Sequence, residues 1–174
     1  MRRTFSFLLC TKEKRSRKEK TFCPRNDVSL LLYEFSQYEL LAFNEEGLFG
    51  YDYLDNYWTE ADRAAYFIRV EGRLAGFVLL YQHAERRDRP VDWSVAEFFV
   101  AYPYRRRGVG SAAMAEVFAR YPGHWQIGYH PKNSGSAAFW RSVAEKAASG
   151  PVEAVVGDRP YKDGSPAQVL CFHV

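Results

Sequence analysis

The sequence of 174 residues has few cysteines and no long hydrophobic run. Its three cysteines, Cys10, Cys23 and Cys171, show no paired spacing, which argues against a disulfide framework and favours a reducing compartment. No apolar stretch approaches the roughly 18 residues that a membrane helix needs, so we expect a cytoplasmic protein without a membrane partner. The four histidines stand in no HxxxH or CxxC pattern, and a metal site is not expected.

Lysine and arginine are absent from residues 34–62, although this stretch holds eight aspartates and glutamates. Residues 1–25, by contrast, hold nine lysines and arginines against two glutamates. We expect residues 1–24 to form a basic, mobile segment and residues 25–174 to form one folded domain. The charge run at 11–20 is short and has no interleaved aromatic residues, so a leader is favoured over an arm that binds nucleic acid.

Apolar residues make up 47% of the chain and aromatic residues 17%, which is ample material for one core. The hydrophobic period changes along the chain between about 3.6 and about 2, as in a domain with both helices and strands. The pattern predicts an α/β single domain with a mixed, mostly antiparallel sheet flanked by helices. We expect helices at 27–35 (capped by Asp27), 108–120 and 136–148, and strands at 65–70, 73–82, 91–101, 125–129, 152–156 and 168–173, with 5–9 as a possible edge strand.

The most informative stretch is a turn between a strand and a helix, Arg105-Arg106-Arg107-Gly108-Val109-Gly110. The first turn of a helix has unpaired N–H groups and a partial positive charge, and glycines let an anion approach the backbone. Arginines beside it add positive charge, so the turn predicts a diphosphate site. A solvated basic loop is the plainer alternative. A dinucleotide fingerprint is disfavoured, because seven residues separate Val100 from Gly108 and no acid follows at the required distance.

This turn resembles the acetyl-CoA signature of the Gcn5-related N-acetyltransferases. The later stretch from Asn133 to Trp140 is similar to the second motif of that family, with Ser136 and Trp140 where alanine and tyrosine are usual. The resemblance implies the fold of that family, acetyl-CoA as the cosubstrate and an amine on a small molecule or peptide as the acceptor. A homodimer is possible, since dimers are common in the family.

The resemblance also implies which residues hold the cofactor. The diphosphate would bind backbone N–H groups of the signature turn, the pantetheine arm would pair with the end of the preceding strand, and Asn133 would hydrogen-bond near the pantetheine. Trp140 would pack beside it. The implied cofactor residues are Phe98, Phe99, Val100, Arg105, Arg106, Arg107, Gly108, Val109, Gly110, Ser111, Asn133 and Trp140.

For catalysis the candidates are Glu97 and Tyr129. Glu97 is the one charged residue in an otherwise apolar strand from Val95 to Val100, and burial would raise its pKa toward that of a general base. A structural role for Glu97, facing water or paired with an arginine, stays open. The family's usual acid is a tyrosine where this chain has Trp140, so Tyr129 is named in its place, with Tyr161 and Tyr104 as further candidates.

The acidic, aromatic stretch at 34–62 is where the resemblance implies a roof over the acceptor site. Such a wall attracts cations, which predicts a cationic acceptor such as a polyamine, an amino sugar or a lysine side chain. A solvated acidic helix face is the alternative. Replacement of the usual tyrosine by Trp140 also leaves open a non-catalytic module that binds acyl-CoA on the same fold.

Overall fold

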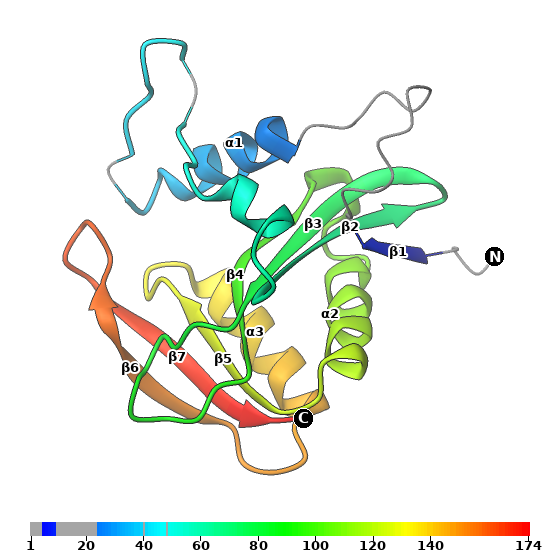
Figure 1. Ribbon diagram of the computed structural model, residues 1–174, viewed down its shortest axis with the longest axis vertical. Coiled ribbons are helices and arrows are strands. Elements are labelled where there is room, and N and C mark those ends of the chain that lie inside the picture. The colour runs from blue at the N-terminus through cyan, green and yellow to red at the C-terminus, as the bar shows by residue number, and fades with distance from the viewer. Residues whose placement is uncertain (1–4, 10–23, 40, 48) are drawn as a thin grey trace.

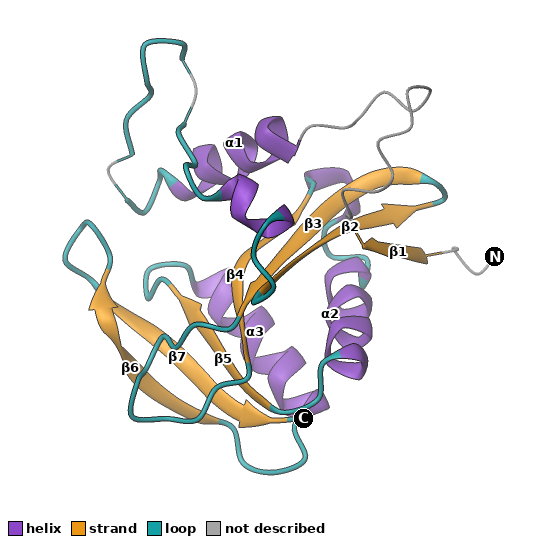
Figure 2. Ribbon diagram, viewed as in Figure 1, coloured by secondary structure: helices purple, strands orange, loops and turns teal. Residues whose placement is uncertain are grey.

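The computed structural model describes residues 5–9, 24–39, 41–47 and 49–174. Within these residues the chain forms one seven-stranded sheet with α-helices on both of its faces (Figures 1 and 2). The elements in chain order are β1 (Phe5–Leu9), α1 (Pro24–Phe35), the 3-10 helix η2 (Leu54–Trp58), β2 (Arg63–Val70), β3 (Arg73–Tyr81), β4 (Trp93–Val100), the 3-10 helix η3 (Tyr102–Tyr104), α2 (Val109–Arg120), β5 (His124–Tyr129), α3 (Ser134–Ala147), β6 (Glu153–Pro160) and β7 (Pro166–His173).

The strand order across the sheet is β1-β2-β3-β4-β5-β7-β6. All neighbours are antiparallel except β4 and β5, which α2 connects in parallel. The predicted mixed, mostly antiparallel sheet is therefore confirmed. The strands that flank each late helix run in the same direction: β4 and β5 around α2 are neighbours, whereas β7 lies between β5 and β6, which α3 connects.

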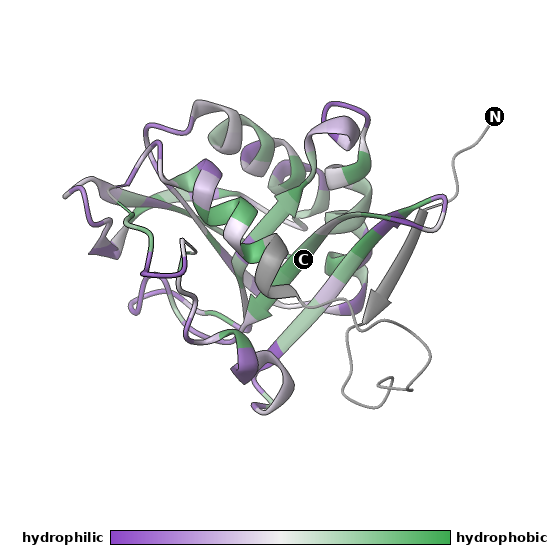
Figure 3. Cartoon of the chain, turned by 90° about the horizontal axis from the view of Figure 1, so that it is seen from above, coloured by the Kyte–Doolittle hydropathy of each residue, from purple (hydrophilic) through white to green (hydrophobic). Residues whose placement is uncertain are grey.

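Two apolar cores lie on opposite faces of this sheet. The larger one packs α2 and α3 against the sheet and includes Met114, Val117 and Trp125. The smaller one packs α1 and η2 against the other face and includes Val28 and Leu54. Figure 3 shows the hydrophobic residues gathered on the central strands, whereas the connecting loops are hydrophilic. The two faces of the sheet therefore carry different helices and can serve different purposes.

The first turns of the chain differ in detail from the sequence expectations. Helix α1 begins at Pro24 rather than behind a cap at Asp27, because proline suits the first turn of a helix, where its missing N–H has no partner. Strand β1 pairs with β2 at the edge of the sheet, where an edge strand was a possibility. Residues 10–23 lie outside the described residues, so the mobile basic segment and the boundary at residue 24 remain predictions.

The hairpin between β2 and β3 follows the sequence closely. Glu71 and Gly72 both have positive φ, 52° and 78°, as a two-residue turn between antiparallel strands requires. Among the described residues, no helix has the length and hydrophobicity to cross a membrane.

Strands β4 and β5 stay together over a short distance only. They pair at Trp93 with Trp125 and at Ser94 with Gln126, and beyond that point they pair no further. On the other side of β4 the register with β3 shifts at Ala96, which marks a β-bulge. A bulge bends a strand and increases its twist. The sheet thus opens between the carboxyl halves of β4 and β5, next to the start of α2.

Candidate active site

The loop before α2 is shaped as an anion-binding turn. Arg106 and Gly108 both have positive φ, 58° and 79°, and successive amides in such a conformation form a concave nest of N–H groups. Gly108 is the N-cap of α2, and no side chain caps this helix end. Among the described residues, no acceptor is bonded to the N–H groups of residues 106–111. Six donors and the positive end of a helix dipole are therefore open to an anion.

Gly110 lets the first turn of α2 approach the aromatic layer beneath it. A Cβ at this position would lie 3.2 Å from the ring of Phe139 and 3.3 Å from that of Phe98. Those two rings stack on each other with centroids 5.2 Å apart. The glycine therefore lets the nest sit closely against α3 and β4, and a side chain at this position would crowd these two aromatic rings.

The three arginines of the turn differ in their contacts. Arg105 donates from Nε to the carbonyl oxygen of Val100 at 2.6 Å, and its Nη2 contacts both carboxylate oxygens of Glu34 at 2.5 and 2.6 Å. Its guanidinium thus ties α1 to the end of β4 and is engaged within the protein. Of the three arginines expected to contact the phosphates, this leaves Arg106 and Arg107, whose side chains are exposed.

Asn133 and Trp140 hold α3 in place. Asn133 caps the helix, because its Oδ1 accepts from the N–H of Ser136 at 2.9 Å, which leaves its Nδ2 for other contacts. Trp140 is only 5% exposed and packs edge-on against Phe98, with ring centroids 5.1 Å apart. The tryptophan therefore supports the strand end that borders the opening in the sheet.

Glu97 lies on the face of the sheet that carries α1 and η2. It pairs with Leu79 across β3, and no arginine or lysine forms an ion pair with it among the described residues. Burial raises the pKa of Glu97 to about 7, a hydrogen bond from Tyr51 opposes this rise, and the nearby carboxylate of Glu85 adds to it. A carboxyl group that titrates near neutral pH has the pKa of a general base.

Two tyrosines from η2 and the turn before it surround Glu97, and single-sequence reasoning did not identify them. Tyr51 donates to Glu97, and its pKa lies far above the ordinary value because of burial and the neighbouring negative charge. Tyr57 is only 5% exposed, and burial raises its pKa to about 12. The Tyr57 side chain lies against Tyr51 and Arg63. The composition of residues 51–58 indicated an aromatic wall, but not which rings face the acid.

The register across β4 and β5 shows what lies opposite Glu97. Counting from the pair Ser94 and Gln126, and allowing for the bulge, Glu97 reaches the level of Gly128 on β5. Tyr129, the next residue, packs into the core under α2 and α3. Glu97 and Tyr129 therefore stand at one level of the opening but on opposite faces of the sheet, and the structure does not bring the two side chains into contact.

The loop between β6 and β7 borders the same face as Glu97. Tyr161 lies against the ring of His130, with centroids 4.5 Å apart, and its pKa is raised by burial and by the charges of Glu85, Glu39 and Glu97. Of the three tyrosines considered as acids, Tyr161 thus lies on the face of Glu97.

Four of the eight acidic residues at 34–62 have partners other than Glu97. Glu34 binds Arg105, and Glu39 is buried and accepts from the backbone N–H of Lys162 at 2.9 Å. Glu60 pairs with Arg63, and Asp62 lies 3.1 Å from Nε2 of His83. The expectation that this stretch supplies the charge of the acceptor wall is therefore not met by these four carboxylates, because each has its own partner.

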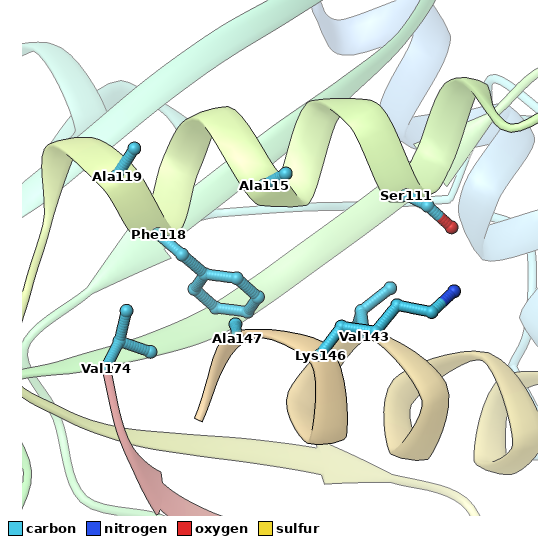
Figure 4. Close-up of a pocket in the computed structure, with 8 residues that line it drawn as sticks. All are labelled: Ser111, Ala115, Phe118, Ala119, Val143, Lys146, Ala147 and Val174. Atoms are coloured by element: carbon cyan, nitrogen blue, oxygen red, sulfur yellow. The ribbon is translucent and has the colours of Figure 1, made fainter. Parts of the chain in front are cut away.

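A groove of about 260 Å³ runs between α2 and α3, away from Glu97 (Figure 4). Ser111 and Lys146 lie at the same end of it in Figure 4, and Ser111 also belongs to the nest before α2. The groove thus continues from the anion-binding turn along the outside of the molecule. Its lining residues are Ser111, Ala115, Phe118, Ala119, Val143, Lys146, Ala147 and Val174.

The comparison with protein families matches residues 31–143 to the Acetyltransferase (GNAT) family. This region contains β4, the nest, α2 and most of α3. The comparison with curated protein sequences gave no match.

Solved structures share the fold at low sequence identity. Diaminobutyrate acetyltransferase from Paenibacillus lautus, in complex with L-2,4-diaminobutyric acid and coenzyme A, is 15% identical with a TM-score of 0.62, covering 98% of this chain and 95% of that one. An acetyltransferase from Thermus thermophilus is 13% identical with a TM-score of 0.59, covering 98% and 97%. A GNAT family acetyltransferase from Elizabethkingia anophelis with acetyl-CoA bound is 12% identical with a TM-score of 0.55, covering 98% of each chain.

The fold, the open nest at the start of α2 and the parted strands β4 and β5 define a protein of the acetyltransferase class. The family match covers more than half of the chain, and the chain belongs to the Gcn5-related N-acetyltransferase (GNAT) family.

Proposed function

We propose that this protein transfers an acetyl group from acetyl-CoA to a primary amine of a small cationic acceptor. The observation that carries the proposal is the run of unbonded N–H groups at residues 106–111, at the start of α2 and beside the opening in the sheet. An acyl carrier with a diphosphate and a long flexible arm matches these features, because the diphosphate suits the N–H groups and the arm suits the opening in the sheet. The neighbours solved with acetyl-CoA or coenzyme A support the same choice.

The donor would be held mainly by backbone. The diphosphate oxygens would accept from the nest amides, and the pantetheine arm would pair with the exposed edge of β4 at Phe98, Phe99 and Val100. A backbone N–H of that strand end would also polarise the thioester carbonyl as negative charge develops on its oxygen. Asn133 offers its Nδ2 to the arm, and Trp140 keeps the strand end rigid from below.

The transfer would be direct. The neutral amine nitrogen attacks the thioester carbonyl carbon, the new C–N bond forms, and the C–S bond breaks as the tetrahedral intermediate collapses. The proton lost by the nitrogen passes to the Glu97 carboxylate, directly or through a water. The departing thiolate takes a proton from Tyr129 on the opposite face, and the products are an N-acetyl amine and coenzyme A.

The acceptor would enter on the face with α1 and η2. Glu97, Tyr51 and Tyr57 lie on this face beside the parted strands, and Arg63, which lies against the ring of Tyr57, is paired with Glu60. An amine fits such a site better than a carboxylate or a phosphate, because the local field attracts cations. The Paenibacillus lautus neighbour was solved with L-2,4-diaminobutyric acid, which carries amino groups, and this supports an amine acceptor.

The experiment has two parts. Calorimetry with acetyl-CoA and coenzyme A measures binding, and mass spectrometry follows the acetylation of a panel of amines, alcohols and amino acids. We expect both acetyl-CoA and coenzyme A to bind, and we expect only the amines to gain the mass of one acetyl group. Absence of coenzyme A binding would overturn the proposal, and binding without turnover on any acceptor would favour a non-catalytic acyl-CoA module.

A further inference from the structure

A second carboxylate, that of Glu85, shares the face of Glu97 and has no role in the chemistry above. It lies in the loop after β3, where its N–H donates to Oε1 of Gln126 at 2.8 Å and its carbonyl accepts from the N–H of Asp158 at 2.9 Å. One carboxylate oxygen accepts from the hydroxyl of Tyr81. The backbone and the side chain of Glu85 are therefore both fixed, as for a residue that holds a ligand.

The carboxylate of Glu85 lies across the opening from Glu97. Its Cδ is 3.5 Å from the place that a Cβ of Gly128 would occupy, so it rests on β5 where that strand has no side chain. Glu97 stands at the same level on β4, and the charge of Glu85 contributes to the raised pKa of Glu97. No lysine, arginine or histidine pairs with Glu85 among the described residues, since the adjacent Arg86 pairs with Asp88.

Tyrosine hydroxyls also lie on this face beside η2. Tyr57 is buried against Tyr51 and Arg63, and Tyr51 in turn donates to Glu97. No lysine or arginine forms an ion pair with Glu85 or Glu97 within the described part of the chain, so both carboxyl groups face this space without a cationic partner.

We propose that the acceptor is a diamine, whose reacting nitrogen lies beside Glu97 while its second, charged ammonium is held by Glu85. This inference rests on the proposed function and names Glu85 as the residue that determines specificity. Tyr81 orients the Glu85 carboxylate, and the ring of Tyr161 borders the same face. Neighbouring strands lie about 5 Å apart and these two diverge, so a spacer of three to five carbons suits the distance between the acids.

The test compares 1,4-diaminobutane with 4-amino-1-butanol, which has the same length and one amine but no second charge. We measure kcat/KM for both with the wild-type chain and with Glu85→Gln at pH 7.5. We expect the wild type to prefer the diamine at least tenfold, and Glu85→Gln to reduce this ratio at least tenfold through KM for the diamine. Glu153→Gln, which removes an exposed carboxylate paired with Arg89 on β6, is the matched control and leaves the ratio unchanged.

The outcomes separate the two proposals. If the wild type acetylates both amines equally well, or if Glu85→Gln lowers both values by the same factor, the diamine inference is wrong and the amine acetyltransferase stands. If neither amine is acetylated while acetyl-CoA still binds, the diamine inference is wrong, and the wider acceptor panel decides whether the amine acetyltransferase stands. The wild-type ratio alone decides the matter if Glu85→Gln does not fold.

Discussion

The two ends of the candidate site are built from different parts of the chain. The donor end consists of backbone amides in six consecutive residues, 106–111, at the start of one helix. The acceptor end consists of side chains from separate segments, with Glu97 on β4, Glu85 after β3, and Tyr51 and Tyr57 before and within η2.

This difference predicts how each end responds to substitution. A backbone nest tolerates changes of side chain as long as its φ and ψ angles survive, whereas a side-chain site depends on the chemical group at each position. The donor end can therefore be shared by proteins with unrelated acceptors, while the acceptor end varies.

The largest effect is expected from Glu97→Gln, which removes the proposed base and keeps its shape. A general base contributes about 10²–10⁴-fold, so kcat should fall by at least about 100-fold. The wild-type rate should rise with pH around 7, because the carboxylate is the active form and its pKa is about 7. The variant should lose that inflection and keep its affinity for acetyl-CoA. Fixed-time assays of kcat from pH 6 to 9 measure both effects. A variant with the same pH–rate profile as the wild type would refute Glu97 as the general base.

The same substitution should change stability in a pH-dependent way. The folded-state pKa of Glu97 is raised above the unfolded value, so ionisation costs folded-state free energy as pH rises from about 4 to 7. Glu97→Gln should therefore be more stable than the wild type at pH 8, by at most about 3 kcal/mol, and no more stable near pH 4. Urea denaturation at both pH values tests the sign, and a variant less stable at pH 8 contradicts it.

Gly108→Val tests the donor end and should weaken acetyl-CoA binding by about tenfold. A Cβ at Gly108 has nothing within 4 Å, but its φ of 79° strains a β-branched residue by roughly 1–2 kcal/mol and re-aims the nest amides. Gly150→Ala is the matched control, because its Cβ would also meet nothing and its φ is not positive. Calorimetry measures both, and equal dissociation constants would mean that the nest conformation does not hold the diphosphate.

The sequence identified the donor end and missed most of the acceptor end for a physical reason. A nest is local, so glycines and arginines within a few residues encode it. The contact of Glu85 with Gly128, by contrast, joins a loop and a strand more than forty residues apart, and only the register of the sheet reveals it. Glu97 was identifiable because a lone acid in an apolar strand is conspicuous on its own.

The fold shows the same limit at particular elements. The turn at Glu71 and Gly72 was predicted because its residue types fix the backbone there. Strand β6 is longer than the expected 152–156, since it runs to Pro160 along an exposed edge where no hydrophobic alternation marks it. Its extent depends on pairing with β7, which a single sequence does not display.

Arg105→Ala should separate scaffold from ligand contact within the signature turn. Loss of the bonds to Glu34 and Val100 should lower the free energy of unfolding by about 1–2 kcal/mol, with less than threefold change in coenzyme A affinity. Arg107→Ala should do the reverse, leaving stability unchanged and weakening binding about threefold in low salt. Thermal unfolding and calorimetry at two salt concentrations check both. A large affinity loss in Arg105→Ala alone would place its guanidinium on the phosphates.

The last substitution tests the end of the groove between α2 and α3 that adjoins the nest. Lys146 and Ser111 line the same end of the groove, so a coenzyme A held in the nest would direct its ribose 3′-phosphate toward this ammonium. Lys146→Glu should then weaken coenzyme A binding about fivefold and leave dephospho-coenzyme A within twofold, because only the former carries that phosphate. Arg141→Glu makes the same charge change on α3 beside Glu145, outside the groove lining, and is the control. Equal losses for both coenzymes would mean that the adenosine end lies elsewhere, and that donor recognition stops at the backbone nest.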